Sequence, residues 1–305
     1  MTAIAMPAWI LLDPLLQDWL REDLGRGDRT TQAICANQTQ QGKAELEVKQ
    51  PGVIAGLPLV HRVFQLLDHD IHWQAAVSDG DWCECLEGKR TAIAQVSGRL
   101  DTLLMGERVA LNLVMHLSGI ATATRRYVDS LAELPTQLVD TRKTTPGLRL
   151  LEKYASQVGG AINHRMGLDD AVMIKDNHIL AAGSIATAIA LVRQQAPFPL
   201  AIEVETESLA QVQAAIEHQA NIIMLDNMPI SLMQDAVQII RHHNPLIKIE
   251  ASGNITLDNL RAVAATGVDY ISTSATITRS PWLDCSLNLY PESSQKRKQT
   301  AQYFQ

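Results

Sequence analysis

No stretch of this sequence is apolar over the ~18 residues that a membrane-spanning helix needs. The first twelve residues are largely apolar, but they carry no basic leader, and Asp13 interrupts the run that follows. A secretion signal would combine a basic start with an apolar centre. We therefore expect no membrane partner for this protein.

Cysteine is scarce, with four residues in a chain of 305. Cys83 and Cys85 are too close together for an ordinary disulfide framework, and no second Cys/His pair completes a zinc site. Unpaired thiols are typical of proteins in a reducing compartment. The expected location is therefore the cytoplasm.

Positive charge is in deficit, because 26 Lys and Arg residues face 33 Asp and Glu residues, for a formal net charge of −7. Such an acidic protein does not suit nucleic acid or an anionic membrane as its main partner. Hydrophobic residues make up 46% of the chain, enough to bury the core of one large or two modest domains. Basic residues that gather locally on this acidic background are therefore informative.

The first part of the chain, up to about residue 115, mixes helical and strand patterns. The expected helices are 9–24, 57–67 and 102–117. The expected strands are 43–49, 53–56 (an extension of the same sheet), 71–77 and 91–96. Asp28 ends a glycine-containing loop after the first helix and can cap a further helix. This region is predicted to have an α+β fold.

From about residue 118 onward, strand and helix patterns alternate. The expected strands are 137–139, 171–174, 200–204, 222–225, 247–251 and 270–273. The expected helices include 185–194, 209–218, 230–242 and 257–265. About six repeats of strand then helix predict a parallel sheet, either closed into a barrel or left open. Neither a GxGxxG turn after a strand nor a P-loop is present, which favours a barrel over a nucleotide-binding open sheet.

Cationic residues follow several of these expected strands, at the ends where parallel barrels build their sites. The residues are Arg142, Lys143, Arg165 and Lys175, with His164 beside Arg165. Arginine can bind carboxylate or phosphate oxygens with two parallel hydrogen bonds, and lysine offers a compact charge for phosphate. The segment Asp140 to Gly147 and its cationic neighbours therefore predict a site for a small, multiply anionic substrate.

Two carboxylates, Glu205 and Asp226, stand at the ends of the next two strands. Among anionic groups they would hold Mg²⁺ or ribose hydroxyls, and Mg²⁺ commonly binds one or two carboxylates together with substrate phosphates. The segment Ser252-Gly253-Asn254 leads into a helix, and its N–H groups can bind a phosphate. This set suits a phosphorylated sugar plus a carboxylated partner.

Structural interpretations compete with these functional ones. Arg142 and Glu205 could form ion pairs that only support a barrel. A lone histidine such as His164 is more often structural than a ligand, although its place before Arg165 favours a site. The pattern around Arg108 indicates a surface or interface arginine.

A series of short motifs runs in order over nearly the whole chain. They are Glu107 to Asn112, His116 to Thr122, Asp140 to Thr144, Asn163 to Arg165, Lys175 to His178, Glu203 to Glu205, Leu225 to Asn227 and Ser252 to Thr256. Together they resemble quinolinate phosphoribosyltransferase, also called nicotinate-nucleotide pyrophosphorylase (carboxylating). One such motif would be a weak signal, but the ordered set is specific.

The resemblance implies an N-terminal α/β sandwich domain at residues 1–117 and an incomplete α/β barrel of about six parallel strands at 118–290. A polar tail follows at 291–305, and the segment before it can pack back on the first domain. The resemblance also implies a homodimer in which the N-terminal domain of one chain closes the barrel mouth of the other. Arg108 would then cross the interface to the partner's site.

The resemblance further assigns roles to individual residues. Those that hold the carboxylates of quinolinate would be Arg108, Arg142, His164 and Arg165. At phosphoribosyl pyrophosphate, Lys143 and Lys175 would bind its phosphates and the substrate edge. Glu205 and Asp226 would act at the ribose and at Mg²⁺, directly or through water. The residues at the 5′-phosphate would be Ser252, Gly253, Asn254 and Ser274. Lys143, Lys175, Glu205 and Asp226 form the catalytic group.

Ser274 departs from the family, which usually has glycine there. A glycine lets the backbone approach a phosphate closely, and serine keeps the N–H contact only if its backbone dihedrals are allowed. The implied reaction joins quinolinate to phosphoribosyl pyrophosphate and yields nicotinate mononucleotide, pyrophosphate and CO2, in de novo NAD biosynthesis. The alternatives are a Schiff-base lyase or aldolase that uses Lys175, a non-catalytic binder of phosphorylated ligands, and a related phosphoribosyltransferase for another aromatic acid.

Overall fold

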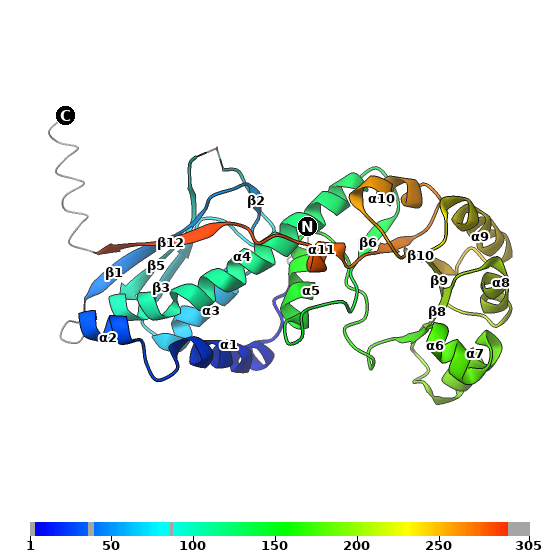
Figure 1. Cartoon of the computed structure of the whole chain (residues 1–305), viewed down its shortest axis with the longest axis horizontal. Coiled ribbons are helices and arrows are strands. Elements are labelled where there is room, and N and C mark those ends of the chain that lie inside the picture. Colours follow the sequence, from blue (N-terminus) through cyan, green and yellow to red (C-terminus); the bar gives the residue numbers. More distant parts are fainter. Residues whose placement is uncertain (1–3, 36–39, 86–87, 292–305) are drawn as a thin grey trace. The chain divides into compact units, whose positions relative to one another are not determined.

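The computed structural model describes residues 4–35, 40–85 and 88–291. The chain divides into two compact units, one made of Met1–Thr122 and Pro281–Gln305 and the other of Ala123–Ser280 (Figure 1). The polar tail expected from residue 291 lies outside the described residues beyond Pro291. None of the helices in the described ranges is long and apolar enough to cross a membrane.

The first unit is built on a four-stranded antiparallel sheet in the order β12-β1-β5-β3. The strands are β1 (Gln41–Val48), β3 (His72–Ala75), β5 (Thr91–Arg99) and β12 (Cys285–Pro291). Every second residue of β1 is buried, as expected for a strand with one face on the core. The strand β12 returns from the far end of the chain and pairs with β1 along its length.

The helices of this unit are α1 (Trp9–Leu24), α2 (Arg29–Cys35), α3 (Leu57–Leu67) and the part of α4 (Leu100–Ser130) up to Thr122. Asp28 caps α2, since its Oδ1 accepts the N–H groups of Thr30 and Thr31 at 3.0 Å. The prediction that 53–56 extends the main sheet was wrong, because β2 (Gly52–Val53) pairs only with β4 (Trp82–Cys83). The helix predicted at 102–117 continues to Ser130. It passes through Gly119, although a glycine in a helix interior destabilises the helix by about 1 kcal/mol relative to alanine, so packing of the helix outweighs this loss.

The second unit is an incomplete parallel barrel, which confirms the predicted fold class. Its strands are β6 (Gln137–Val139), β7 (Val172–Ile174), β8 (Ile202–Thr206), β9 (Ile222–Asp226), β10 (Lys248–Ser252) and β11 (Tyr270–Ser272). They form one six-stranded sheet in the order β6-β11-β10-β9-β8-β7, so that β6 and β7 are its two edges. All of its pairings are parallel.

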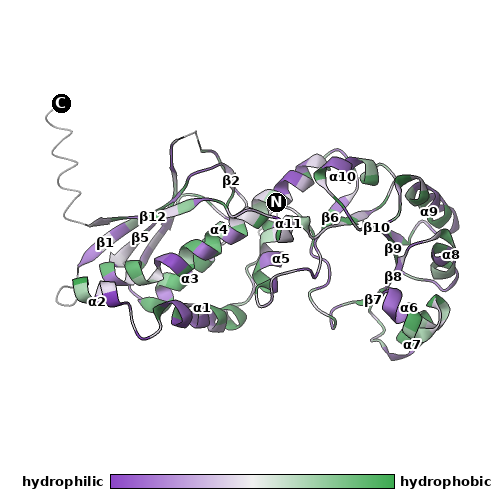
Figure 2. Ribbon diagram, viewed as in Figure 1, coloured by the Kyte–Doolittle hydropathy of each residue, from purple (hydrophilic) through white to green (hydrophobic). Residues whose placement is uncertain are grey.

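Helices cover the outside of this curved sheet (Figure 1). Those predicted are α7 (Ile185–Gln195), α8 (Leu209–Glu217), α9 (Ile230–His243) and α10 (Leu257–Ala264); those not predicted are α5 (Arg149–Val158), α6 (Asp176–Ala182) and α11 (Ala275–Thr278). Buried residues recur three and four positions apart, as at Met233, Ala236, Val237 and Ile240 of α9. Figure 2 shows hydrophobic residues along α7, α8 and α9.

A buried ion pair fixes the chain where β6 ends. Asp140 follows β6 and contacts Lys153 of α5, and both side chains are fully buried. The carboxylate also accepts hydrogen bonds from Asn163 Nδ2 at 2.5 Å and from the backbone N–H of His164 at 2.9 Å. Burial raises the pKa of Asp140 and lowers the pKa of Lys153, and their mutual attraction opposes both shifts. Each charge therefore depends on the other.

The substitution Lys153→Met tests this dependence, since it leaves Asp140 buried without its counter-charge. We expect the free energy of unfolding to fall by about 3–5 kcal/mol, the usual cost of removing one partner of a buried ion pair. Urea denaturation followed by circular dichroism measures the change. Lys248→Met, at an exposed position of β10, is the matched control and should stay within about 0.5 kcal/mol of the unsubstituted protein. Equal losses in both variants would contradict the prediction.

Candidate functional site

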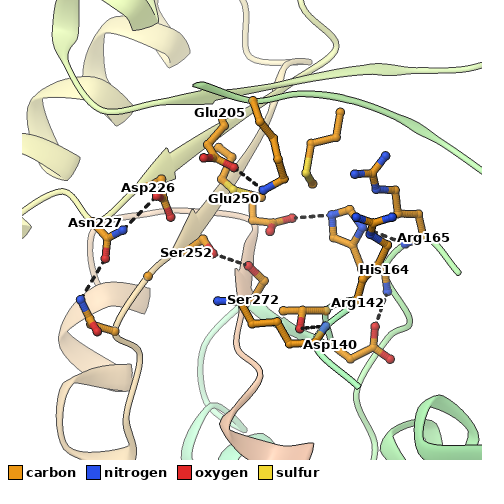
Figure 3. Close-up of a pocket in the computed structure, with 17 residues that line it drawn as sticks. Asp140, Arg142, His164, Arg165, Glu205, Asp226, Asn227, Glu250, Ser252 and Ser272 are labelled. Atoms are coloured by element: carbon orange, nitrogen blue, oxygen red, sulfur yellow. Dashed lines mark hydrogen bonds and ion pairs between the residues drawn. The ribbon is translucent and has the colours of Figure 1, made fainter. Parts of the chain in front are cut away.

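The carboxyl ends of the barrel strands surround a cavity of about 560 Å³ whose lining residues all belong to the second unit (Figure 3). Each strand contributes at or just after its end. The contributors include Lys175 after β7, Glu205 in β8, Asp226 in β9, Ser252 in β10 and Ser272 in β11. This convergence follows from parallel strand direction, since all carboxyl ends reach the same face.

Four cations line this cavity, and they are the four that the sequence predicted: Arg142, Lys143, Arg165 and Lys175. Arg165 is largely buried, at 8% exposure, and its Nη1 donates to the carbonyl oxygen of Ala171 at 2.9 Å. Burial lowers the pKa of Arg165, and the nearby charge of Arg142 lowers it further. Both guanidinium groups line the same cavity, where a multiply charged anion could contact the two together.

Two carboxylates face these cations from neighbouring strands. Glu205 Oε2 lies 2.6 Å from Lys175 Nζ, so these side chains form an ion pair within the cavity. Asp226 accepts a hydrogen bond from Asn227 Nδ2 at 2.9 Å. Oxygen ligands of this kind suit Mg²⁺, which prefers carboxylates supplemented by substrate oxygens and water. Glu205 and Asp226 thus have the chemistry to hold that ion beside a phosphorylated substrate.

The loops after β9 and β10 are tied together by backbone geometry. Gly253 has a φ of +90°, and a Cβ at this position would lie 2.2 Å from Asn227 Oδ1. Asn227 Oδ1 also accepts from Asn254 Nδ2 at 3.0 Å. Only glycine satisfies both constraints, so the Ser252-Gly253-Asn254 segment comes close to the loop beside Asp226.

A second hollow of about 240 Å³ shares Lys143 and the 252–254 segment with the first. Its other side contains Ser274 and Arg279. Ser274 precedes α11 with φ −90° and ψ −10°. Because this φ is negative, the backbone here does not require glycine. Arg279 is a cation that the sequence did not single out, because it follows the last short helix rather than a strand.

His164 is bound through both ring nitrogens. Its Nε2 lies 3.2 Å from Glu203 Oε2 and 3.4 Å from Glu250 Oε2, and its Nδ1 accepts the backbone N–H of Arg165 at 2.8 Å. Burial alone lowers the pKa of His164, but hydrogen bonds to the two carboxylates outweigh it and raise the pKa to about 10. Burial raises the pKa of Glu203 as well.

The contact at Nδ1 and the raised pKa of His164 disagree about the charge of the ring. A hydrogen bond accepted by Nδ1 needs the lone pair of that nitrogen, so it opposes a doubly protonated ring. The contact fixes the tautomer, because the backbone N–H of Arg165 can donate only to a ring nitrogen that carries no proton. In either charge state, Nε2 carries a proton and donates it toward Glu203 and Glu250.

The structure does not bring every predicted residue into the cavity lining. Arg108 lies on α4 in the first unit, where its side chain is 60% exposed and 3.8 Å from Glu107. Glu203 and Glu250 are charged residues within apolar strands, and no site role was predicted for them from the sequence. A buried charge in a strand interior is itself the signal that could have marked them.

Two family models match adjacent parts of the chain. The N-terminal domain of quinolinate phosphoribosyl transferase matches residues 28–118, and the C-terminal domain of the same enzyme matches residues 120–288. Together they include every residue of the cavity described above.

Similar proteins agree with these matches. A probable nicotinate-nucleotide pyrophosphorylase (carboxylating) of Synechocystis sp. is 59% identical over 284 residues, which cover 93% of this chain and 94% of that protein. The human nicotinate-nucleotide pyrophosphorylase (carboxylating) is 37% identical over 94% of each chain. The crystal structure of NadC from Streptococcus pyogenes has a TM-score of 0.87 at 40% identity and covers 94% of this chain and 99% of its own. The chain belongs to the quinolinate phosphoribosyltransferase family.

Proposed function

We propose that this protein is a quinolinate phosphoribosyltransferase that converts quinolinate and phosphoribosyl pyrophosphate to nicotinate mononucleotide, pyrophosphate and CO2. The observation that carries the proposal is the cavity at the barrel mouth, where four cations share the lining with the carboxylates of Glu205 and Asp226 at the strand ends. A dicarboxylate and a pyrophosphate need the cations, whereas a ribose and Mg²⁺ need the carboxylates. Membership of the family adds the reaction to this chemistry and places it in NAD biosynthesis.

The carboxylate subsite lies around Arg142 and Arg165, with His164 beside them. Two guanidinium groups in a half-buried wall can bind two neighbouring carboxylates with paired hydrogen bonds. Arg108 of a second chain would complete this subsite in a homodimer. Its side chain on α4 is 60% exposed and lies 3.8 Å from Glu107.

The phosphoribosyl subsite extends from Lys143 and Lys175 to the 252–254 loop and Ser274. The lysines would bind pyrophosphate oxygens, and backbone N–H groups of the loop would bind the 5′-phosphate. Glu205 and Asp226 would hold Mg²⁺, directly or through water, and the ion would neutralise charge on the leaving pyrophosphate. Because Glu205 pairs with Lys175 at 2.6 Å, binding of the ion would free Lys175 for the substrate.

The chemical step requires positioning and electrostatic stabilisation more than proton transfer. The pyridine nitrogen attacks the anomeric carbon of the ribose as pyrophosphate leaves, and positive charge develops on the sugar. Glu205 and Asp226 can stabilise that charge across the cavity. The ring nitrogen then carries a positive charge and accepts the electron pair that remains when the adjacent carboxylate leaves as CO2. A proton replaces the carboxylate on that carbon.

The Lys175–Glu205 ion pair also weighs against a Schiff-base lyase. Formation of a Schiff base needs an amine that is free to attack a carbonyl group, whereas Lys175 Nζ is held in an ion pair with Glu205 Oε2 at 2.6 Å. The location in the cytoplasm remains part of the proposal, since the thiols of Cys35, Cys83 and Cys285 form no disulfide, as is usual in a reducing compartment.

Release of labelled CO2 tests the function directly. Quinolinate labelled in the carboxylate next to the ring nitrogen should yield labelled CO2 only when both phosphoribosyl pyrophosphate and Mg²⁺ are present. Pyrophosphate should appear in equal amount. Removal of Mg²⁺ with a chelator should stop both products, and added Mg²⁺ should restore them. Folded protein that releases no CO2 under these conditions would contradict the proposed function.

Arg142→Ala should reduce kcat/KM for quinolinate by roughly 10²–10³-fold, since it removes a charge-assisted contact from a partly desolvated site. Steady-state kinetics with each substrate varied in turn measures the loss. Arg126→Ala, at an exposed position of α4, serves as the matched arginine control and should keep full activity. Full activity of Arg142→Ala would show that this arginine does not bind the substrate.

A mixing experiment tests whether Arg108 acts across a dimer interface. Arg108→Ala and Lys175→Ala should each be nearly inactive alone. Denatured and refolded together at equal amounts, they should recover about one quarter of the unsubstituted activity, because half of the dimers are mixed and each mixed dimer has one intact site. Absence of recovery, with dimers present by light scattering, would place Arg108 in its own chain's site or outside both.

A further inference from the structure

Two buried carboxyl groups lie beside His164, and one of them, that of Glu250, lines the cavity. Glu203 comes from β8 and Glu250 from β10, and each residue is only 3% exposed. One oxygen of each points to His164 Nε2, at 3.2 Å and 3.4 Å, and Figure 3 shows the Glu250 carboxylate directed at the ring. The other oxygen of each is buried and has no hydrogen-bond partner among the described residues. We call Glu203 and Glu250 the acid pair.

The acid pair is not explained by stability. A buried acceptor without a partner costs about 1–3 kcal/mol, and apolar residues of similar size would fill the barrel interior at lower cost. Strained or unsatisfied groups of this kind concentrate where a site needs them. The acid pair is therefore expected to have a role in the cavity that Glu250 lines.

A chain of hydrogen bonds leads from the acid pair to Arg165. The acid pair accepts the proton on His164 Nε2, which fixes the ring plane. The ring then presents Nδ1 to the backbone N–H of Arg165 at 2.8 Å. The backbone N–H of His164 is itself held by Asp140 at 2.9 Å. The backbone that carries the Arg165 side chain is thus held from both sides.

We propose that Glu203 and Glu250 are positioning residues that act through His164 on Arg165 and so set where the Arg165 guanidinium meets a substrate carboxylate. His164 then supports the carboxylate subsite from behind, because its two ring nitrogens are both occupied. The inference depends on the proposed function for the identity of the substrate, a pyridine dicarboxylate.

A metal ion is the competing explanation for the same side chains, because ligand atoms of His164, Glu203 and Glu250 lie within 4.8 Å of one another. A histidine that binds a metal through Nε2 must leave that nitrogen without a proton. Here Nδ1 accepts a hydrogen bond, which places the ring proton on Nε2. The geometry therefore favours the hydrogen-bonded arrangement over metal binding.

Kinetics of Glu250 variants provide the first test. Glu250→Ala should raise KM for quinolinate by about tenfold to a hundredfold, as expected when a charged contact is misplaced, with less than about threefold change in KM for phosphoribosyl pyrophosphate. Glu250→Gln should restore most of the affinity, because its amide oxygen can still accept from Nε2 and its amide nitrogen can donate to Glu203. Glu217→Gln, at an exposed position of α8, is the matched control and should behave as the unsubstituted protein.

Nitrogen-15 NMR of the histidine ring provides a second test that requires no turnover. The His164 signals are identified among the nine histidines by their loss in His164→Gln. In the unsubstituted protein they should report a proton on Nε2 and none on Nδ1. In Glu250→Gln the same tautomer should persist. This readout remains available if Glu250→Ala does not fold.

Several results would overturn the inference. One is a Glu250→Ala variant with the KM for quinolinate of the unsubstituted protein, and another is a His164 ring protonated on Nδ1 and bare on Nε2. A third is tight binding of Mn²⁺ or Zn²⁺ in calorimetry that disappears in Glu250→Gln, which would establish the metal site instead. Failure of the unsubstituted protein to release CO2 would refute the proposed function alone, since the NMR result stands independently of it.

Discussion

The buried carboxylate of Asp140 is the contact on which the anion site depends. It receives the ammonium of Lys153, the side-chain amide of Asn163 and the backbone N–H of His164, and so joins β6, α5 and the segment beside β6. Arg142 lies two residues after Asp140 in the chain, and Arg165 directly follows His164, whose N–H Asp140 binds. Guanidinium groups repel each other, and Arg142 indeed lowers the pKa of Arg165. The scaffold must therefore hold together cations that would separate on their own.

This arrangement suits a reaction whose catalysis depends on positioning. Arg165 and Lys175 are each held by a contact within the protein, to the carbonyl oxygen of Ala171 and to Glu205 respectively, so their positions are partly set in advance. Without substrate, Lys175 and Glu205 form an ion pair with each other at 2.6 Å. In the proposed reaction, a substrate with Mg²⁺ would replace both halves of that ion pair at once, because it would bring an anion for the lysine and a cation for the carboxylate.

Much of this was predictable from the sequence, for a physical reason. Apolar strands that alternate with amphipathic helices specify a parallel barrel, and its geometry sends residues such as Arg142 and Asp226 to one face. The pairing of β12 with β1 was not predictable in the same way, because it joins residues more than 200 positions apart. The short β2–β4 pairing was missed for a similar reason, since two residue pairs leave no periodic pattern. The acid pair was missed because its partner, His164, lies on a different segment.

The segment Glu203-Val204-Glu205 shows how depth along one strand divides these roles. Side chains two positions apart on a strand face the same side and are separated by roughly 6.6 Å. Val204 between them points into the hydrophobic core. Glu205 lines the cavity, whereas Glu203 is one step deeper and almost fully buried. A glutamate of this strand can therefore line the cavity at the barrel mouth, as Glu205 does, or contact the buried ring of His164, as Glu203 does. Its distance from the end of the strand determines which of these two positions it takes.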